Sequence, residues 1–383
     1  MTIALPPAGL ENVVVANTAL SAIDGGAGRL SYAGYDIGEL AQATFEEVFF
    51  LLLRGELPTR DELAAFSMQL AAHRSLSVAE LALVRALPKD GHGMDALRTL
   101  LSALMQHHPE TTLTIEQAEQ MGVLAAARLP TLITAWHRLR VGLEPVVPNQ
   151  QLGHAANILW MLHGEQPSPV AERALTTYMV LLAEHGLNAS TFAARVAIGA
   201  QADVGGALVA AAATLKGVLH GGANQKAMEM FLAIGSADRA ATYIDALIGR
   251  HERLMGVGHR IYKVEDPRVR HLRARVHELA EAGQGAEWQA VADAVTGVVA
   301  SHPHFTVRQL APNVEFYSAP LLYALGFPLD LFTCAFALSR VAGWTAHIRE
   351  QIADNRLIRP KAEYVGPAPR TNNTFAFARL PAC

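Results

Sequence analysis

The stretch TFEEVFFLLLRGELPTRDELAAFSMQLAAHR, residues 44–74, decides the fold class. From Thr44 to Leu57 and again from Thr59 to Arg74, apolar residues recur at intervals of three and four positions, with polar residues between them. This spacing is typical of an amphipathic helix, and the acidic pair Asp61-Glu62 suits a helix N-terminus. The segment therefore predicts two consecutive helices.

The same helical period returns along the rest of the chain. Ser168-Pro169, ahead of Val170–Glu184, resembles an N-cap followed by proline in the first turn. Alternating apolar and polar runs are scarce, and only Asn12–Asp24 is a candidate strand pair. We therefore expect a mainly α fold.

The length of the chain favours two domains, because single cores tend to split beyond about 250–300 residues. The chain has 383 residues, and its charge density rises around 223–307. We expect a smaller helical domain, residues 223–325, inserted into a large helical domain made of residues 1–222 and 326–383, which end in a C-terminal arm. Ligand sites often lie in clefts between domains, so we expect the site there.

The composition excludes several classes of partner. A net charge of −4, without a run of lysines or arginines, gives no footprint for nucleic acid or a membrane surface. The most apolar windows, such as 207–219, are shorter than the roughly 20 residues of a membrane span and are predicted to be buried helices. Only Cys334 and Cys383 occur, which fits a reducing cytoplasm, and residues 1–9 show no secretion signal.

Histidine is abundant, with 16 residues, so a metal centre has to be considered. The pairs His107-His108 and His302-Pro303-His304 lack the spacing of metal ligands, and neither His-Glu-x-x-His nor Cys-x-x-Cys occurs. The sequence therefore predicts no metal centre.

Three histidines adjoin glycines, in Glu184-His185-Gly186, Leu219-His220-Gly221-Gly222 and Gly256-Val257-Gly258-His259. Glycine permits tight backbone turns, so these histidines are candidates to face a ligand. Each has a structural alternative: His185 could end the preceding helix, and His220 could be bonded to a helix terminus. His259 precedes a basic loop, with Arg260, Lys263 and Arg268, that suits carboxylates or phosphates.

Two charged residues complete the candidate site. Glu315 follows Pro312-Asn313 in a stretch too irregular for a helix interior, although it could be only a helix-capping acid. Arg340 lies in the apolar run 332–344, where an unpaired charge would be costly. It therefore needs either a ligand or an internal salt bridge.

These residue types suit carbon–carbon bond formation beside a thioester. A carboxylate can remove a weakly acidic proton, a neutral histidine can donate a hydrogen bond to the thioester oxygen, and a second histidine can polarise the ketone that accepts the carbanion. The sequence contains a candidate for each role.

Taken together, the segments resemble the citrate synthase family, which includes 2-methylcitrate synthases, over nearly the whole chain. The residues that carry the resemblance are 18–25, 30–37, 94–99, 188–192, 219–224, 255–268, 312–318 and 339–360. The family implies a helical homodimer of large and small domains that closes over oxaloacetate, with acyl-CoA as second substrate and no metal or redox cofactor. The likeness starts near Leu10, without the extension of hexameric members, which also favours a dimer.

The resemblance also implies roles for individual residues. The implied catalytic residues are His220 at the thioester oxygen, His259 at the ketone and Glu315 as the proton-abstracting acid. Those implied to bind oxaloacetate are His185, Arg268, Arg340 and, from the partner subunit, Arg359. Lys263 and Asn313 would contact CoA, and Asn188 and Ser190 would support the site.

Glu315 departs from the family, which has aspartate there, and misplacement of a catalytic group by about 1 Å can cost about 10²-fold in rate. We predict a cytoplasmic acyltransferase of the tricarboxylic acid cycle, which condenses acetyl-CoA with oxaloacetate and hydrolyses the product to citrate. One alternative is 2-methylcitrate synthase, since one methylene changes pocket preference by only about 1–3 kcal/mol. Another is a catalytically impaired relative that binds oxaloacetate or CoA.

Overall fold

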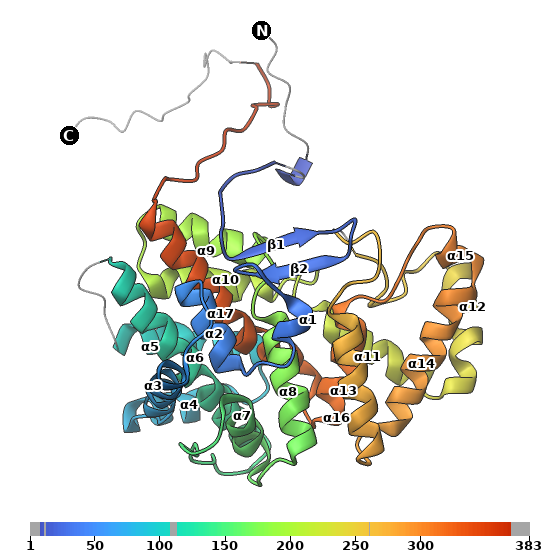
Figure 1. Cartoon of the computed structure of the whole chain (residues 1–383), viewed down its shortest axis with the longest axis horizontal. Coiled ribbons are helices and arrows are strands. Elements are labelled where there is room, and N and C mark those ends of the chain that lie inside the picture. The colour runs from blue at the N-terminus through green and yellow to red at the C-terminus, as the bar shows by residue number, and fades with distance from the viewer. Residues whose placement is uncertain (1–7, 11–12, 108–112, 260, 369–383) are drawn as a thin grey trace, which may run out of the picture.

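The structure is a computed structural model that describes residues 8–10, 13–107, 113–259 and 261–368. A small antiparallel sheet lies at one edge of a mainly helical molecule (Figure 1). Its strands are β1 (Ser21–Asp24), β2 (Arg29–Tyr32) and β3 (Tyr35–Asp36). The first ten α-helices are α1 (Ile37–Leu40), α2 (Phe45–Arg54), α3 (Arg60–Ala72), α4 (Val78–Ala86), α5 (Gly93–His107), α6 (Ile115–Arg140), α7 (His154–His163), α8 (Pro169–Leu182), α9 (Ala189–Gly199) and α10 (Val204–Leu215). They are followed by α11 (Ala223–Ile234), α12 (Ala240–Gly249), α13 (Val269–Glu281), α14 (Ala286–Ser301), α15 (Pro303–Thr306), α16 (Val314–Ala324) and α17 (Phe332–Ala353).

The two helices predicted from residues 44–74 are confirmed, and local side chains explain their ends. Thr44 caps α2 and Thr59 caps α3, each in a capping box with a glutamate three residues later. Gly55 ends α2 with φ of 81°, a left-handed conformation that favours glycine. Ser168 caps α8, whose first residue is Pro169, as predicted.

The core is built around α17, which is buried over most of its length and packs against α6, α8 and α9. Figure 1 places it in the middle of the molecule. Gly122 of α6 lies so close to α17 that a Cβ there would collide with Thr345. Trp136 of α6 and Trp344 of α17 are also buried, with exposures of 1% and 0%. The mainly α prediction is confirmed.

The predicted strand pair within Asn12–Asp24 is wrong in its extent. Only Ser21–Asp24 forms a strand, and its partner is Arg29–Tyr32, outside the predicted range, while residues 11 and 12 lie outside the described part of the chain. The Asp24 side chain accepts hydrogen bonds from the amides of Gly26 and Ala27, which closes the turn. An aspartate–glycine turn is a hairpin signal, and it starts where the prediction ended.

Helices α11–α16 gather on one side of the molecule and α3–α7 on the other (Figure 1). Helix α13 packs on α16 of the first group and on α8, which in turn packs on α7 of the second group, so α13 and α8 together join the two groups. The proposed boundaries at residues 223 and 325 stay a prediction.

The prediction of a buried helix over 207–219 is wrong at its end. Helix α10 stops at Leu215, and Leu219 is fully exposed in the turn that follows. Gly221 explains the stop, because its amide donates to the Leu215 carbonyl and a Cβ there would collide with that oxygen. Among the described residues, no helix is long and apolar enough to span a bilayer.

Candidate active site

His220 sits in the turn after α10 and contacts the N-terminus of α9. The Ser190 amide donates to Nε2 of His220 across 3.3 Å, and the Ser190 hydroxyl lies 2.8 Å from the same nitrogen. Burial and Arg340 lower the pKa of His220 to about 4, so the ring is neutral at pH 7. Because Nε2 accepts the amide hydrogen bond, the ring proton is assigned to Nδ1. His220 is therefore bonded to a helix terminus through Nε2, and its Nδ1–H can still donate to a ligand. The structural and the functional interpretations of this residue both hold.

Ser190 connects His220 to the core. Its hydroxyl accepts a hydrogen bond from Nε1 of Trp344 at 3.1 Å and lies 2.8 Å from Oδ1 of Asn188. Asn188 in turn caps α9 through the Thr191 amide. Of the two residues predicted to support the site, Ser190 thus contacts His220 and Asn188 contacts Ser190, and Trp344 of the buried α17 holds Ser190 in position.

His185 and His259 face each other, with ring centroids 5.7 Å apart. Nδ1 of His259 accepts hydrogen bonds from the amides of Ile261 and Tyr262, at 3.0 and 3.1 Å, which leaves the proton of the neutral ring on Nε2. Burial and Arg268 lower the pKa of His259 to about 4. Burial, with Arg268 and Arg340, holds the pKa of His185 well below its usual range. Both rings are therefore neutral donors at pH 7.

His185 does not end a helix, because α8 stops at Leu182. It lies on a short connection beside Glu184, a fully buried carboxylate. Glu184 accepts hydrogen bonds from the Ser21 hydroxyl at 3.0 Å and the Gly186 amide at 2.5 Å, and lies 3.0 Å from Nε2 of His347. Strand β1 and α17 thus hold the loop that carries His185.

Glu315 lies in the first turn of α16, so the prediction that 312–318 is too irregular for a helix is wrong from Val314 onward. Asn313 caps the helix by accepting the Glu315 amide at 3.1 Å, and its own amide group donates to the Gly258 carbonyl at 2.8 Å. This links Glu315 to the loop of His259. Burial raises the pKa of Glu315, while Arg268 opposes the rise. A carboxylate with a raised pKa is suited to general-base chemistry.

The two buried arginines of the candidate site, Arg268 and Arg340, have different partners. Arg268 forms two hydrogen bonds with Asp266, at 2.9 and 2.7 Å, and both residues are 2% exposed. Burial acts to raise the pKa of Asp266, but Arg268 more than offsets it and holds the pKa below its usual range.

Arg340 donates from Nε to the Leu182 carbonyl at 2.6 Å and lies over the Phe336 ring, 4.8 Å from its centroid. No carboxylate lies within ion-pair distance of Arg340 in the described part of the chain, so the salt-bridge alternative is not realised there. A buried cation without an ion-pair partner is suited to an anionic ligand.

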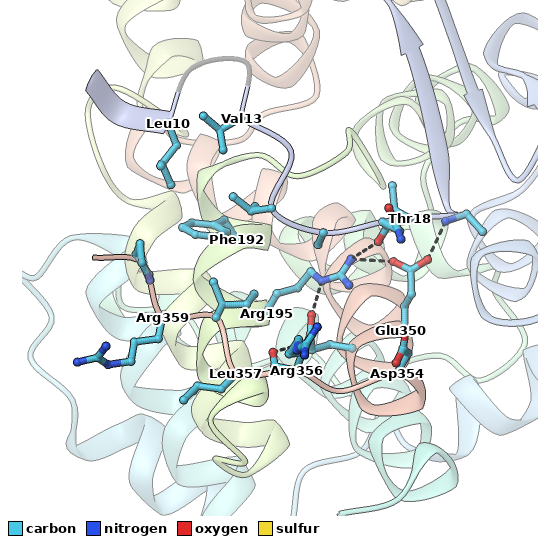
Figure 2. Close-up of a pocket in the computed structure, with 17 residues that line it drawn as sticks. Leu10, Val13, Thr18, Phe192, Arg195, Glu350, Asp354, Arg356, Leu357 and Arg359 are labelled. Atoms are coloured by element: carbon cyan, nitrogen blue, oxygen red, sulfur yellow. Dashed lines mark hydrogen bonds and ion pairs between the residues drawn. The ribbon is translucent and has the colours of Figure 1, made fainter. Parts of the chain in front are cut away.

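Arg359 is not brought to the histidines in the single chain. It is exposed, and it lines a cavity of about 860 Å³ together with residues from 13–19 and 354–360. Figure 2 shows its side chain extending away from Arg195 and Glu350, which form an ion pair at 2.8 Å. Lys263 is also exposed, and its amide donates to the Gly25 carbonyl.

Asn313 and His259 border another cavity, of about 730 Å³, whose lining includes the cationic side chains Arg253 and Arg308. Arg260 and His108 lie outside the described residues, as does the His107 side chain. No group of three residues that could hold a metal ion occurs in the described ranges.

Sequence reasoning missed several residues that organise the site: Tyr262, Asp266, Glu184, Trp344 and His347. Asp266 had a local signal, since a buried arginine two residues away needs a counter-ion. Glu184 had none, because its partners Ser21 and His347 lie 163 positions away on either side.

The fold and these contacts can be compared with known proteins. The family model described as "Citrate synthase, C-terminal domain" matches residues 9–361. This chain belongs to the citrate synthase family. It is accordingly an enzyme of the transferase class, and both the resemblance and the mainly α fold predicted from the sequence are confirmed.

Curated relatives cover almost the whole chain. A citrate synthase from Haloferax volcanii is 43% identical, over 94% of this chain and 95% of the relative. A 2-methylcitrate synthase from Mycobacterium tuberculosis is 40% identical, over 94% and 91%.

Solved structures agree. Citrate synthase from Pyrobaculum aerophilum has a TM-score of 0.87 and 39% identity, covering 96% of this chain and 94% of that one. A Thermoplasma acidophilum citrate synthase, solved in a ternary complex with carboxymethyl coenzyme A and oxaloacetate, has a TM-score of 0.87 and 29% identity, covering 96% and 98%.

Proposed function

We propose that this enzyme condenses acetyl-CoA with oxaloacetate and hydrolyses the resulting thioester to citrate and CoA. The observation that carries the proposal is that the candidate site combines two neutral histidine donors with a carboxylate suited to act as a base. His220 and His259 are neutral rings with one assigned donor each, and Glu315 is a carboxylate of raised pKa influenced by Arg268 and Arg340.

The first step is proton removal. Glu315 takes a proton from the acetyl methyl group, while Nδ1–H of His220 donates a hydrogen bond to the thioester oxygen and stabilises the enolate. The enolate carbon then forms a bond to the keto carbon of oxaloacetate. As the C=O π bond breaks, the keto oxygen is polarised by Nε2–H of His259 and takes that proton to become a hydroxyl. Water finally cleaves the thioester, which releases CoA thiol and the new carboxylate.

Substrate binding uses the buried cations. We propose that Arg268, Arg340 and His185 hold the oxaloacetate carboxylates, since guanidinium groups match carboxylates in geometry. The cavity beside Asn313 would take the CoA moiety, with Lys263 near its phosphates. The reaction needs no metal or redox cofactor, because every step is proton transfer or addition to a carbonyl.

We further propose a homodimer in which Arg359 completes the partner's site. Its exposure supports this, and Figure 2 shows its side chain extending away from Arg195 and Glu350. A cation without an ion-pair partner among the described residues of its own chain is available to another chain. A cytoplasmic location is proposed because Cys334 is a free, buried thiol and the chain has only one other cysteine.

A second candidate is 2-methylcitrate formation from propionyl-CoA, favoured by the 40% identity to the Mycobacterium tuberculosis relative. Steady-state release of CoA thiol separates the two reactions. With oxaloacetate saturating, kcat/KM should be higher for acetyl-CoA than for propionyl-CoA. A propionyl-CoA preference would reassign the substrate, and release from neither thioester would favour a binding protein impaired by Glu315.

A further inference from the structure

Tyr262 touches both histidines that face oxaloacetate in the proposed mechanism. It lies on the loop between α12 and α13 and is 3% exposed. Its ring centroid is 4.7 Å from that of His259 and 5.7 Å from that of His185. A tyrosine packed against two candidate ligand-binding rings can orient both.

The contact with His259 uses the backbone. The Tyr262 amide donates to Nδ1 of His259 at 3.1 Å, together with the Ile261 amide at 3.0 Å. Two amide donors on one nitrogen exclude a proton from it. The ring therefore carries its proton on Nε2.

The contact with His185 uses the side chain. The Tyr262 hydroxyl lies 3.1 Å from Nε2 of His185. Burial raises the pKa of Tyr262, so the hydroxyl keeps its proton, and His185 is neutral. A phenol is a better donor than a neutral imidazole, so the hydroxyl donates to Nε2 and leaves the His185 proton on Nδ1.

The β1–β2 hairpin holds the Tyr262 loop in place. The Gly25 carbonyl accepts the Lys263 amide at 2.8 Å, and a Cβ on Gly25 would collide with the Ile261 carbonyl. The same hairpin reaches the His185 loop through Ser21, whose hydroxyl accepts the Gly186 amide at 3.1 Å. The β1–β2 hairpin therefore contacts both the Tyr262 loop and the His185 loop and fixes their relative position. This arrangement allows Tyr262 to contact both histidines.

We infer that Tyr262 is a positioning residue that fixes the tautomers of His185 and His259, so that each ring presents a single N–H donor to a keto dicarboxylate. The inference rests on the proposed function for the identity of that ligand. The tautomers themselves are a property of the free protein.

The test uses Tyr262→Phe, which removes the hydroxyl and keeps both the ring and the amide. Calorimetric titration with oxaloacetate should give about tenfold weaker binding, the loss of roughly one hydrogen bond. KM for acetyl-CoA at saturating oxaloacetate should change less than twofold. Tyr35→Phe is the matched control, because it removes a tyrosine hydroxyl bonded to Glu56, outside the site.

Long-range ¹H–¹⁵N spectra of ring-labelled histidine supply a readout that general loosening would not give. Wild-type protein should show His185 protonated on Nδ1 and His259 on Nε2, and Tyr262→Phe should change the pattern of His185 alone. A wild-type His185 protonated on Nε2, or an unchanged pattern with unchanged oxaloacetate affinity in the variant, would overturn the inference. If wild-type protein binds no oxaloacetate, the proposed function fails, and the spectra still decide the role of Tyr262.

Discussion

Asp266 holds the Arg268 guanidinium by two hydrogen bonds, at 2.9 and 2.7 Å, in a site where both side chains are buried. The two bonds use Nε and Nη2 of Arg268, and Asp266 balances its charge when no ligand is bound. A substrate-binding arginine can thus stay buried before the substrate arrives. This pairing leads to the first prediction.

Asp266→Ala should destabilise the fold by about 3–5 kcal/mol, because it leaves a buried guanidinium without its counter-ion. Denaturant unfolding measures the change. Glu144→Ala is the control, since it breaks an exposed ion pair with Arg85 and should cost far less. Equal losses of unfolding free energy in the two variants would mean that the buried ion pair stabilises the fold no more than the exposed one.

Ser190→Ala should lower kcat about tenfold, because His220 loses a hydroxyl contact and Trp344 loses its acceptor. KM for oxaloacetate should change little, since Ser190 contacts His220, which acts on the thioester, and not the histidines that face oxaloacetate. Ser301→Ala, at an exposed serine bonded to the Gly297 carbonyl, is the control in the same steady-state assay. An unchanged kcat in Ser190→Ala would show that the amide alone positions His220.

As pH is lowered, the decrease in kcat/KM should reflect the protonation of a single group. Glu315 must be ionised and its pKa lies above the usual 4.5, whereas His220 and His259, with pKa values of about 4, are already neutral there. Activity should therefore fall with unit slope as pH drops through a midpoint above 4.5. A limb of slope two, centred near the ordinary histidine value of 6.5, would contradict neutral histidines.

Glu315→Gln should raise the melting temperature at pH 7. The folded state raises the pKa of this carboxyl, so the fold binds more protons than the unfolded chain and loses stability as pH rises from about 4.5 through the folded pKa. The cost is therefore larger at pH 7 than at pH 4, and glutamine removes it. Calorimetry at pH 7 and pH 4 checks this, with exposed Glu281→Gln as the control. A stabilisation of equal size at both pH values would point to packing instead of charge.

Arg359→Ala and His259→Ala chains should each be inactive alone and regain activity when mixed. In the proposed dimer, a mixed pair holds one site with His259 from one chain and Arg359 from the other. Random pairing predicts about a quarter of the wild-type rate. Absence of recovery, with mixed dimers present by mass spectrometry, would place Arg359 in its own chain's site.

Local signals made the helices predictable from sequence. Thr44 and Thr59 cap their helices through glutamates three residues later, so both signals lie within one turn. The hairpin was misplaced because the alternating polar and apolar run of its second strand, Arg29–Tyr32, is only four residues long. The start of α16 was missed because Pro312-Asn313 resembles a helix-breaking pair, whereas Asn313 is the N-cap of the helix.

In the candidate site, too, the residues with a local sequence signal were predicted and those defined by long-range contacts were not. His220 and His259 were found because each adjoins a glycine, a signal visible within four residues. Glu184 was not, because only folding brings it to Ser21 and His347. Tyr262 was missed because its hydroxyl meets His185, 77 positions away. Residues that hold others in place are defined by tertiary contacts, which sequence spacing does not encode.

The central claim is that Glu315 removes the acetyl proton. Its most direct test is the kcat for CoA release from acetyl-CoA by Glu315→Gln, beside calorimetric binding of oxaloacetate to the same variant. We predict a fall in kcat of about 10²–10⁴-fold, the usual worth of general acid–base catalysis, with oxaloacetate still bound. A kcat within a few-fold of wild type would contradict the claim.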